Sequence, residues 1–393
     1  MRVAIDSRQV RPGMTFFALK GEKVDGHSFL EEAAKRGAVK AIVEEGYQGP
    51  DFGMELASVS DVEEELQRQA KEFRKKIQAK VVGVTGSVGK TTAKEFIATL
   101  LESSFRVDKS VGSFNSQLTL PLSILNADLD AEVLVLEMGM SKPGELAKLT
   151  EIAQPEIAVI TKIAYSHSEN FADLNGIAQA KAEILQSPRL KKTFVGKQAK
   201  SFSPFSSGEV PEESSIVLPF EAYHLQENFI LAKAVAEYLG VPFLEICKQA
   251  KKLSPFSHRF ERITLGGITF IDDSYNANPA SMKAALQNLP EGKRRIAVLG
   301  EMRELGKFSQ ISHEQIGSIA AEEVDLLFTL GEEAKVLFDR FALSKKMACH
   351  FTDKEKLLQA LRSEVCAGDV VLLKGSNSLQ MWTLLDHFSS TMV

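Results

Sequence analysis

The sequence has few cysteines, no long apolar run and no excess of positive charge. Three of its 393 residues are cysteines, and Cys247, Cys349 and Cys366 lie too far apart to form a CxxC pair. This spacing gives no disulfide framework and favours a reducing cytoplasm, with all three side chains buried or half-buried. No apolar run reaches the roughly 18–20 residues of a membrane helix, so we expect no membrane insertion, and we expect no secretion signal at MRVAIDSRQV.

The net charge of −5 argues against a basic surface that binds nucleic acid. The short cluster Arg74-Lys75-Lys76 is expected on a solvated helix face. Apolar residues make up 44% of the chain and charged residues 25%, which is typical of a globular protein. The length predicts two or three domains.

The first part of the chain, to about residue 78, predicts a small α/β unit. Its pattern indicates a helix at 27–38, a strand at 39–45 and an amphipathic helix from Asp61 to Gln78. From Lys80 onward, apolar strands alternate with helical segments. The strands are KVVGVT, AEVLVLEMG and EIAVIT. This alternation predicts a parallel sheet with crossover helices.

A third unit is expected from about Pro255, after an irregular stretch at 187–220 and a helix at 228–240. Its first segment predicts a hairpin that turns at Gly266-Gly267. Three further strands follow, each ending in glycine: RRIAVLG, VDLLFTLG and DVVLLKG. The predicted fold class is therefore α/β with a second doubly wound sheet, and ligands of such sheets gather at the carboxyl ends of the strands.

The stretch VTGSVGKTT, residues 84–92, follows the first strand of the middle unit. Gly86 and Gly89 let the backbone approach an anion, and the next helix offers unpaired N–H groups. Lys90 would face the outer phosphates, and Thr91 would offer a hydroxyl to Mg²⁺. The usual phosphate-loop pattern has glycine where this chain has Val84, but the strand–loop–helix context still predicts a nucleotide site.

Three further residues of the middle unit are candidate metal ligands. Glu137 ends the strand EVLVLE, where a metal-binding carboxylate belongs in such a sheet. His167 follows EIAVIT, and Lys181 lies in IAQAKAEIL. Taken alone, Glu137 could be a solvated strand-end glutamate, whereas a histidine such as His167 is more often a surface or hydrogen-bonded residue and a lysine such as Lys181 an ordinary helix residue.

In the third unit, IDDSYNANPASM places polar groups at a strand end where ligands of such a sheet bind. Pro279 then opens a helix at its first position. The polar residues are Asp272, Asp273, Tyr275, Asn276 and Asn278. Asparagine-rich turns of this kind often have no role beyond reversing the chain. Arg259, upstream in SHRFER, is a candidate phosphate contact or a surface ion pair.

Together these segments resemble the Mur ligases of peptidoglycan synthesis. The matching motifs are TGSVGKTT, LEMGMSKPGELAKL, AQAKAEIL, HRFE, DDSYNANPASMKAAL, LGEMRELG and LLKGSNS. The resemblance implies three domains: a UDP-muramoyl substrate domain (1–78), a central P-loop ATPase domain (79–254) and a C-terminal Rossmann-like domain (255–393). It also implies a cytoplasmic enzyme, which we expect to be a monomer.

YNANP paired with GEMRELG resembles the family members that join D-alanyl-D-alanine to UDP-N-acetylmuramoyl-tripeptide. In the implied reaction, ATP phosphorylates the tripeptide carboxylate, and the dipeptide amine attacks the acyl phosphate. The alternatives are a family member that adds diaminopimelate or lysine, and a P-loop binding protein without turnover.

The resemblance also implies roles for single residues. The implied catalytic residues are Lys90, Lys181 (as a carbamate), His167 and Arg259. The implied ATP contacts are Gly86, Ser87, Gly89, Lys90, Thr91, Thr92, Asn228, Arg259 and Asp273. The implied Mg²⁺ ligands are Thr91, Glu137, His167 and Lys181. The implied substrate contacts are Ser7, Arg8, Asn115, Ser116, Tyr275, Asn276 and Asn278. The chain departs from the family motifs at Leu225, Ser116 and Thr119.

Overall fold

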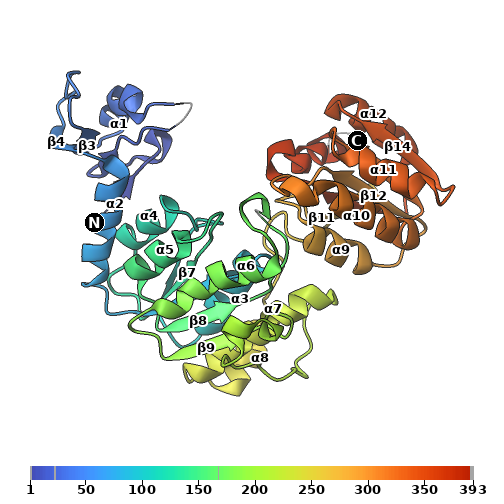
Figure 1. Ribbon diagram of the computed structural model, residues 1–393, viewed down its shortest axis with the longest axis horizontal. Helices are drawn as coiled ribbons and strands as arrows, with labels where there is room; N and C mark the ends of the chain where they lie inside the picture. The colour runs from blue at the N-terminus through green and yellow to red at the C-terminus, as the bar shows by residue number, and fades with distance from the viewer. Residues whose placement is uncertain (1, 22–23, 167, 390–393) are drawn as a thin grey trace. The chain divides into compact units, whose positions relative to one another are not determined.

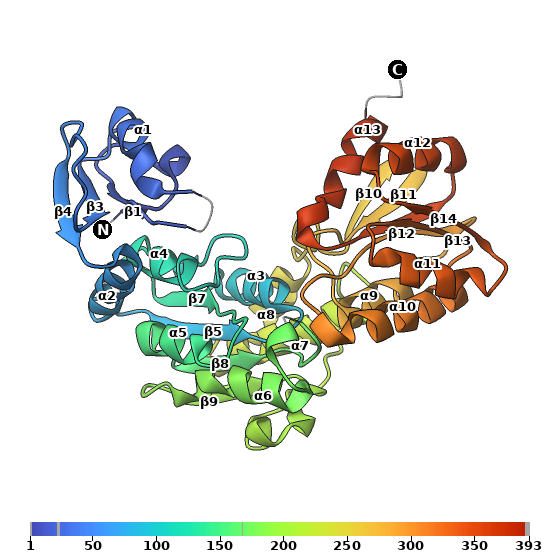
Figure 2. The same ribbon diagram turned by 45° about the horizontal axis from the view of Figure 1, so that its top comes forward.

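The computed structural model describes residues 2–21, 24–166 and 168–389. These described residues form three separate sheets (Figures 1 and 2). By its contacts the chain divides into two compact units. The first unit comprises residues 1–85, 101–160 and 180–194, and the second comprises residues 86–100, 161–179 and 195–393.

The first sheet is parallel, in the order β1-β2-β3-β4. Its strands are β1 (Val3–Ala4), β2 (Thr15–Phe17), β3 (Lys40–Glu44) and β4 (Glu55–Val59). Its helices are α1 (Leu30–Lys35) and α2 (Val62–Arg74), with short 3-10 turns at Ser7–Gln9 and Gly26–Phe29. The Asp61 side chain caps α2 by accepting a hydrogen bond from Glu64 N, 2.9 Å away. The predicted strand and the amphipathic helix are present as β3 and α2, although α2 ends four residues before Gln78.

Arg74 corrects the expectation of a solvated helix face. Its side chain is only 1% exposed. Nε donates to Ala153 O at 2.7 Å and Nη1 to Ile77 O at 3.0 Å, and Nη2 lies 3.6 Å from a carboxylate oxygen of Glu156. Arg74 thus ties α2, which packs on α4 and α5, to the chain that follows α5.

The middle sheet has the order β6-β7-β5-β8-β9. Its strands are β5 (Lys80–Thr85), β6 (Val107–Lys109), β7 (Val133–Glu137), β8 (Ile157–Ile160) and β9 (Lys192–Val195). The accompanying helices are α3 (Lys90–Leu101), α4 (Thr119–Leu125), α5 (Glu145–Ala153), α6 (Leu174–Ala182), α7 (Tyr223–Tyr238) and α8 (Phe243–Ala250), with 3-10 turns at Ser168–Asn170, Glu183–Gln186, Ala199–Ser201 and Ser203–Phe205. Pairings among β5, β6, β7 and β8 are parallel, as predicted. The stretch 187–220 was expected to be irregular and partly exposed, but it contributes the edge strand β9.

The third sheet has the order β10-β11-β15-β12-β13-β14. Its strands are β10 (Glu261–Leu265), β11 (Ile268–Asp272), β12 (Arg295–Gly300), β13 (Leu326–Leu330), β14 (Met347–Phe351) and β15 (Val370–Lys374). Its helices are α9 (Pro279–Gln287), α10 (Ser309–Glu323), α11 (Ala334–Ala342), α12 (Lys354–Glu364) and α13 (Asp386–Ser389), with 3-10 turns at Gly306–Phe308, Asn377–Leu379 and Met381–Leu384. The predicted hairpin is β10–β11, the only antiparallel pairing among this sheet's described strands.

Both faces of this third sheet are covered, as Figure 2 shows. Helices α9, α10 and α11 pack on one face, and α12 packs on the other. Because successive residues of a strand point to opposite faces, Ala297 and Val298 enter different cores. The half-exposed edge strand β14 was not predicted, because it lacks the continuous apolar run of its neighbours.

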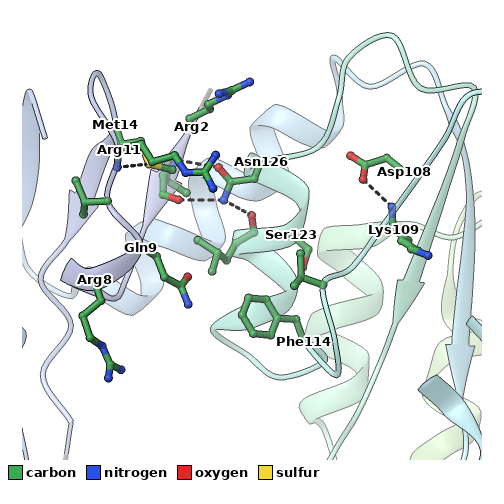
Figure 3. Close-up of a pocket in the computed structure, with 14 residues that line it drawn as sticks. Arg2, Arg8, Gln9, Arg11, Met14, Asp108, Lys109, Phe114, Ser123 and Asn126 are labelled. Carbon is green, nitrogen blue, oxygen red and sulfur yellow. Dashed lines mark hydrogen bonds between the residues drawn. The ribbon is translucent and has the colours of Figure 1, made fainter. Parts of the chain in front are cut away.

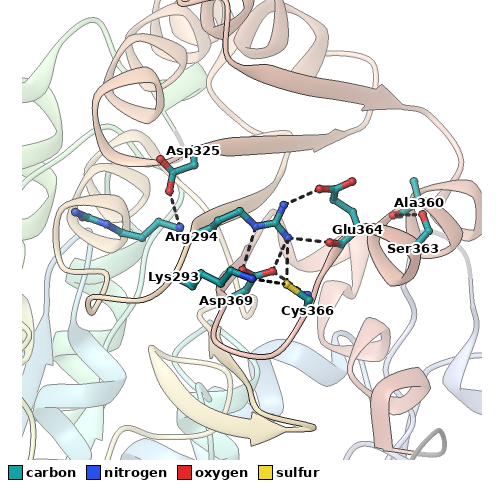
Figure 4. Close-up of polar contacts among 9 residues, drawn as sticks. Lys293, Arg294, Asp325, Ala360, Ser363, Glu364, Cys366 and Asp369 are labelled. Carbon is teal, nitrogen blue, oxygen red and sulfur yellow. Dashed lines mark hydrogen bonds and ion pairs between the residues drawn. The ribbon is translucent and has the colours of Figure 1, made fainter.

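An ion-pair cluster fastens the start of β12 to the segment between α12 and β15 (Figure 4). Arg294 reaches Asp369 with two nitrogens, at 2.7 and 3.1 Å, and Glu364 with a third at 2.7 Å. Cys366 lies beside this cluster and is exposed, contrary to the expectation that all three cysteines are at least half-buried.

Candidate active site

The phosphate loop lies between the end of β5 at Thr85 and the start of α3 at Lys90. Gly86 and Gly89 have φ angles of +148° and +87°. A Cβ atom on Gly86 would come within 2.0 Å of Thr161 Oγ1, and one on Gly89 within 2.5 Å of Asn228 Oδ1. Glycine is therefore needed at both positions, for backbone conformation and for space.

Hydrogen bonds fix the conformation of this loop. Ser87 N donates to Lys162 O at 2.7 Å, and Ser87 Oγ donates to Ala164 O at 2.8 Å. Thr161 Oγ1 donates to Val88 O at 2.6 Å, and Lys90 Nζ donates to Gly86 O at 2.9 Å. Lys90 thus curls over the loop that precedes its own helix. Thr91 and Thr92, on the first turn of that helix, are 1% and 5% exposed.

Asn228, a distant member of the predicted ATP site, contacts the loop directly. It lies on α7, is 7% exposed and packs on Gly89. Its Nδ2 donates to His224 O at 2.8 Å, which fixes the amide. Burial, reinforced by the positive charges of Lys374 and Lys162, lowers the pKa of His224 to about 4. His224 is therefore neutral at pH 7.

In the first unit, the structure joins a predicted metal ligand to a predicted substrate contact. Glu137 ends β7 level with Val84 of β5, and it is 1% exposed. Asn115 Nδ2 donates to Glu137 Oε1 at 2.7 Å. Ser116 and Thr119, which depart from the family motif, bond to each other with their hydroxyl oxygens 3.0 Å apart at the start of α4.

Lys181 is 3% exposed near the end of α6. Two residues later, Glu183 accepts hydrogen bonds from Gly144 N at 2.8 Å and Ala147 N at 2.9 Å. This carboxylate thus caps α5 and anchors the chain that carries Lys181. His167, the remaining predicted metal ligand, lies outside the described residues.

The predicted residues of the third sheet lie around the turn after β11. Lys374 Nζ lies 2.6 Å from an Asp273 carboxylate oxygen and also donates to Asn276 O at 3.0 Å. Burial raises the pKa of Asp273, while Lys374 opposes that shift. The guanidinium carbon of Arg259 lies 4.1 Å from the centre of the Tyr275 ring.

Asn278 caps the start of α9. Its side chain accepts a hydrogen bond from Ser281 N at 2.9 Å, and Ser281 Oγ completes a capping box. Leu225, which replaces an asparagine of the family motif, is 2% exposed and belongs to the core beneath the third sheet. The lost polar group is therefore replaced by an apolar core contact.

Sequence reasoning missed a pocket of about 660 Å³ in the first unit (Figure 3). The residues that line it come from two stretches of chain, 2–14 and 108–126. Its basic side chains are Arg2, Arg8, Arg11 and Lys109. Asn126 connects the two stretches, because Val3 N donates to Asn126 Oδ1 at 2.9 Å and Asn126 Nδ2 donates to Val3 O at 3.0 Å. Only Arg8 had been predicted, since nothing in the sequence links the two stretches.

Ser7 and Arg8 differ in their surroundings. Ser7 is 5% exposed and its hydroxyl donates to Glu32 Oε2 at 2.6 Å. Arg8 is paired with Asp6 at 2.7 Å, and its side chain is 79% exposed. Arg8 is thus placed to meet a ligand, whereas Ser7 supports the turn beneath it.

A glycine loop between a parallel strand and a helix, set in an α/β fold of three sheets, defines a P-loop nucleotide-binding protein. Three family models match: "Mur ligase family, catalytic domain" at residues 2–78, "Mur ligase middle domain" at 84–243 and "Mur ligase, glutamate ligase domain" at 258–377. The chain belongs to the Mur ligase family.

Among its relatives is UDP-N-acetylmuramoyl-tripeptide–D-alanyl-D-alanine ligase of Bacillus subtilis, at 32% identity over 96% of this chain and 91% of the relative. The ligase of that name from Escherichia coli is 28% identical over 96% of this chain and 91% of that protein. Among solved structures, MurF from Acinetobacter baumannii has a TM-score of 0.86 at 28% identity, covering 99% of this chain and 93% of that one. MurF ligase from Thermotoga maritima in complex with ADP has a TM-score of 0.78 at 30% identity, and the match covers 99% of this chain and 97% of that one. The predicted family and three-domain fold are confirmed.

Proposed function

We propose that this enzyme joins D-alanyl-D-alanine to UDP-N-acetylmuramoyl-tripeptide with ATP, giving the pentapeptide for peptidoglycan synthesis. The observation that carries this proposal is the glycine loop before α3, with Asn228 packed on it, in a chain that matches ligases of this name over nearly its whole length. The γ-phosphoryl group of ATP moves to the tripeptide carboxylate. The dipeptide amine then attacks the acyl phosphate and loses a proton, and phosphate leaves with the C–O bond electrons.

The phosphate loop is assigned to the ATP phosphates. Gly86, Ser87 and Gly89 offer backbone N–H groups, and Lys90 supplies a positive charge. Thr91 and Thr92 begin the helix that follows. Asn228 is assigned to the adenine side of the nucleotide, since it borders the loop.

Magnesium fits the chemistry of the side chains present. The buried carboxylate of Glu137 and the hydroxyl of Thr91 are the hard oxygen ligands that Mg²⁺ prefers. Lys181 fits as a carbamate, because carbamylation replaces an ammonium by an anionic oxygen ligand. His167 remains a proposed ligand. When bound, Mg²⁺ offsets the negative charge of the triphosphate and carboxylate as they meet.

The pocket of the first unit is assigned to the UDP end of the substrate. Its basic residues Arg8, Arg11 and Lys109 suit a diphosphate. Ser7 supports this pocket, while Asn115 and Ser116 are assigned to the muramoyl-peptide part. A substrate group bound by Asn115 would lie beside Glu137, because the two side chains are hydrogen-bonded.

The third sheet supplies the remaining proposed contacts. Arg259 is assigned to the γ-phosphate and Asp273 to the ribose. The turn with Tyr275, Asn276 and Asn278 is assigned to the amine substrate, with Asn278 acting through the helix that it caps.

We also propose domain boundaries at 1–78, 79–254 and 255–393, a cytoplasmic location and a monomeric state. The three family models match within these boundaries. Among the described residues, no helix combines the length and apolar character needed to cross a membrane.

The test is a coupled phosphate-release assay over a panel of UDP-muramoyl peptides with amino acids or dipeptides. We expect release only when ATP, a UDP-tripeptide and D-alanyl-D-alanine are present together. The panel includes tripeptides that end in diaminopimelate and in lysine, which identifies the preferred third residue. Release with a UDP-dipeptide and a free amino acid would indicate the alternative ligase that adds diaminopimelate or lysine. No release with any pair would indicate a binding protein.

A further inference from the structure

Arg259 lies between two residues in the left-handed backbone region. His258 has a φ of 60° and Phe260 a φ of 63°. This region disfavours a residue with a Cβ atom, and it persists only where surrounding contacts impose it. The conformation next to Arg259 therefore needs a specific restraint.

Asp272 and Trp382 restrain the side chain of His258. Asp272 is wholly buried, and its Oδ2 lies 2.6 Å from His258 Nδ1. The other oxygen accepts hydrogen bonds from the backbone N–H and the hydroxyl of Ser274. The Trp382 ring stacks on the imidazole of His258, with centres 5.2 Å apart. His258 is therefore held at its ring as well as at its backbone.

The same histidine is connected to the stacking partner of Arg259. Tyr275 N donates to His258 O at 3.1 Å, and the Tyr275 ring lies under the Arg259 guanidinium. Arg259 Nε is buried and has no hydrogen-bond partner among the described residues. The stack on Tyr275 and the backbone at His258 thus set the direction of the guanidinium.

The ligand atoms of His258, Glu261 and Asp272 lie within 4.8 Å of one another, which is also compatible with a metal site. However, both oxygens of Asp272 are engaged in hydrogen bonds, and a carboxylate oxygen of Glu261 lies 3.2 Å from the backbone N of His258. The arrangement is better explained as a restraint on the chain than as a cation site.

We propose that His258, held by Asp272 and Trp382, is a positioning residue that aims Arg259 at the phosphoryl group. This inference rests on the role of Arg259 in the proposed function. His258 would then influence phosphoryl transfer only indirectly, by orienting Arg259.

The experiment compares three substitutions that separate backbone from side chain. Asparagine tolerates positive φ and keeps a donor near the position of Nδ1; glycine tolerates positive φ without a donor; alanine offers neither. We expect His258→Ala to lower kcat roughly 10–10²-fold with little change in the KM for D-alanyl-D-alanine. His258→Gly should be intermediate, and His258→Asn should recover most of the parent kcat.

Two further readouts separate positioning from general damage. Trp382 is the single tryptophan of the chain, so its fluorescence reports directly on the stack with His258. In an Arg259→Ala background, His258→Ala should lower kcat no further, since the two residues act as one unit. Thermal melts identify any variant that has simply lost its fold, and the asparagine variant then carries the test.

Equal effects of His258→Ala with and without Arg259 would overturn the proposal. So would binding of Mg²⁺ or Zn²⁺, measured by titration calorimetry, that disappears in Glu261→Gln. If Arg259→Ala itself leaves kcat unchanged while the parent enzyme still ligates, the role of Arg259 is wrong and the positioning proposal falls with it. If the parent releases no phosphate with any substrate pair, the proposed function itself has failed.

Discussion

The phosphate loop and the pocket of the first unit are both suited to phosphate groups, but they are built differently. The loop is a continuous stretch, residues 86–92, that uses glycine, backbone N–H groups and one lysine. The pocket draws its basic groups from two stretches that are about 100 residues apart and joined by Asn126. A continuous site depends on local backbone conformation, whereas a composite site depends on packing between distant segments. Substitutions should therefore affect the two sites in different ways.

The largest effect is expected from Lys90→Ala in the loop. Removing this charge should lower kcat by roughly 10²–10⁴-fold, because it acts on charge that develops during phosphoryl transfer. The thermal midpoint should remain near that of the parent. Steady-state phosphate release and circular dichroism measure the two properties, and Lys142→Ala, at an exposed lysine, is the matched control. Turnover within a few fold of the parent would refute the assignment of the loop.

Lys181→Ala should also be nearly inactive, because the proposed site would lose a carbamate oxygen. Addition of short-chain carboxylates should restore part of the activity, while Lys191→Ala should behave like the parent. The carbamate itself is measurable by ¹³C NMR after exchange with labelled CO₂. An ammonium at Lys181 in an active enzyme would contradict the proposal.

Arg74→Ala should act on the packing of the first unit rather than on the chemistry. The substitution removes buried donors to Ala153 O and Ile77 O, so the free energy of unfolding should fall by about 3 kcal/mol. Denaturant unfolding measures this change. Lys75→Ala, at the exposed neighbouring residue, should have little effect; equal effects at both positions would mean that burial of Arg74 does not matter.

The loop region should also respond to pH through His224, whose carbonyl oxygen holds Asn228. The folded pKa of His224 is about 4, against an ordinary value of 6.5, so the unfolded chain takes up the proton first as pH falls. This stability is present above the unfolded pKa and is lost as pH falls toward the folded value. Between about pH 7 and pH 5 the loss should be about 2 kcal/mol.

His224→Phe should remove that part of the pH dependence, because phenylalanine fills a similar space without a titrating group. Urea unfolding of the parent and the variant at both pH values makes the comparison. An identical pH dependence in the two proteins would assign the acid sensitivity to other groups.

The smallest effect is expected in the pocket. Arg11→Ala should raise the KM for the UDP-substrate roughly tenfold, the factor that corresponds to about 1.4 kcal/mol, with kcat and the KM for ATP unchanged. Arg362→Ala, at an exposed arginine of α12, is the control. A change in the KM for ATP instead would mean that the pocket serves the nucleotide, and the contrast between the two sites would then disappear.

Much of the third sheet and the phosphate loop could be predicted because their signals are local. Apolar runs predicted β5, β7, β8, β12, β13 and β15, and glycine pairs predicted the hairpin and the loop. The edge strands β9 and β14 escaped prediction, because an edge strand carries a weaker apolar pattern. The buried position of Arg74 also escaped, since a run of three basic residues usually faces solvent.

The sequence by itself therefore determined the α/β class, the family and the glycine loop between β5 and α3, because these depend on short-range periodicity and on residue types at fixed spacing. Only the tertiary structure decided that Asn228 packs on Gly89, that Asn115 binds Glu137, and that His258 is held by Asp272 and Trp382. Such pairs lie far apart along the chain, and no local pattern records them. They are set by which surfaces the sheets and helices bury against each other, and that is a property of the folded chain as a whole.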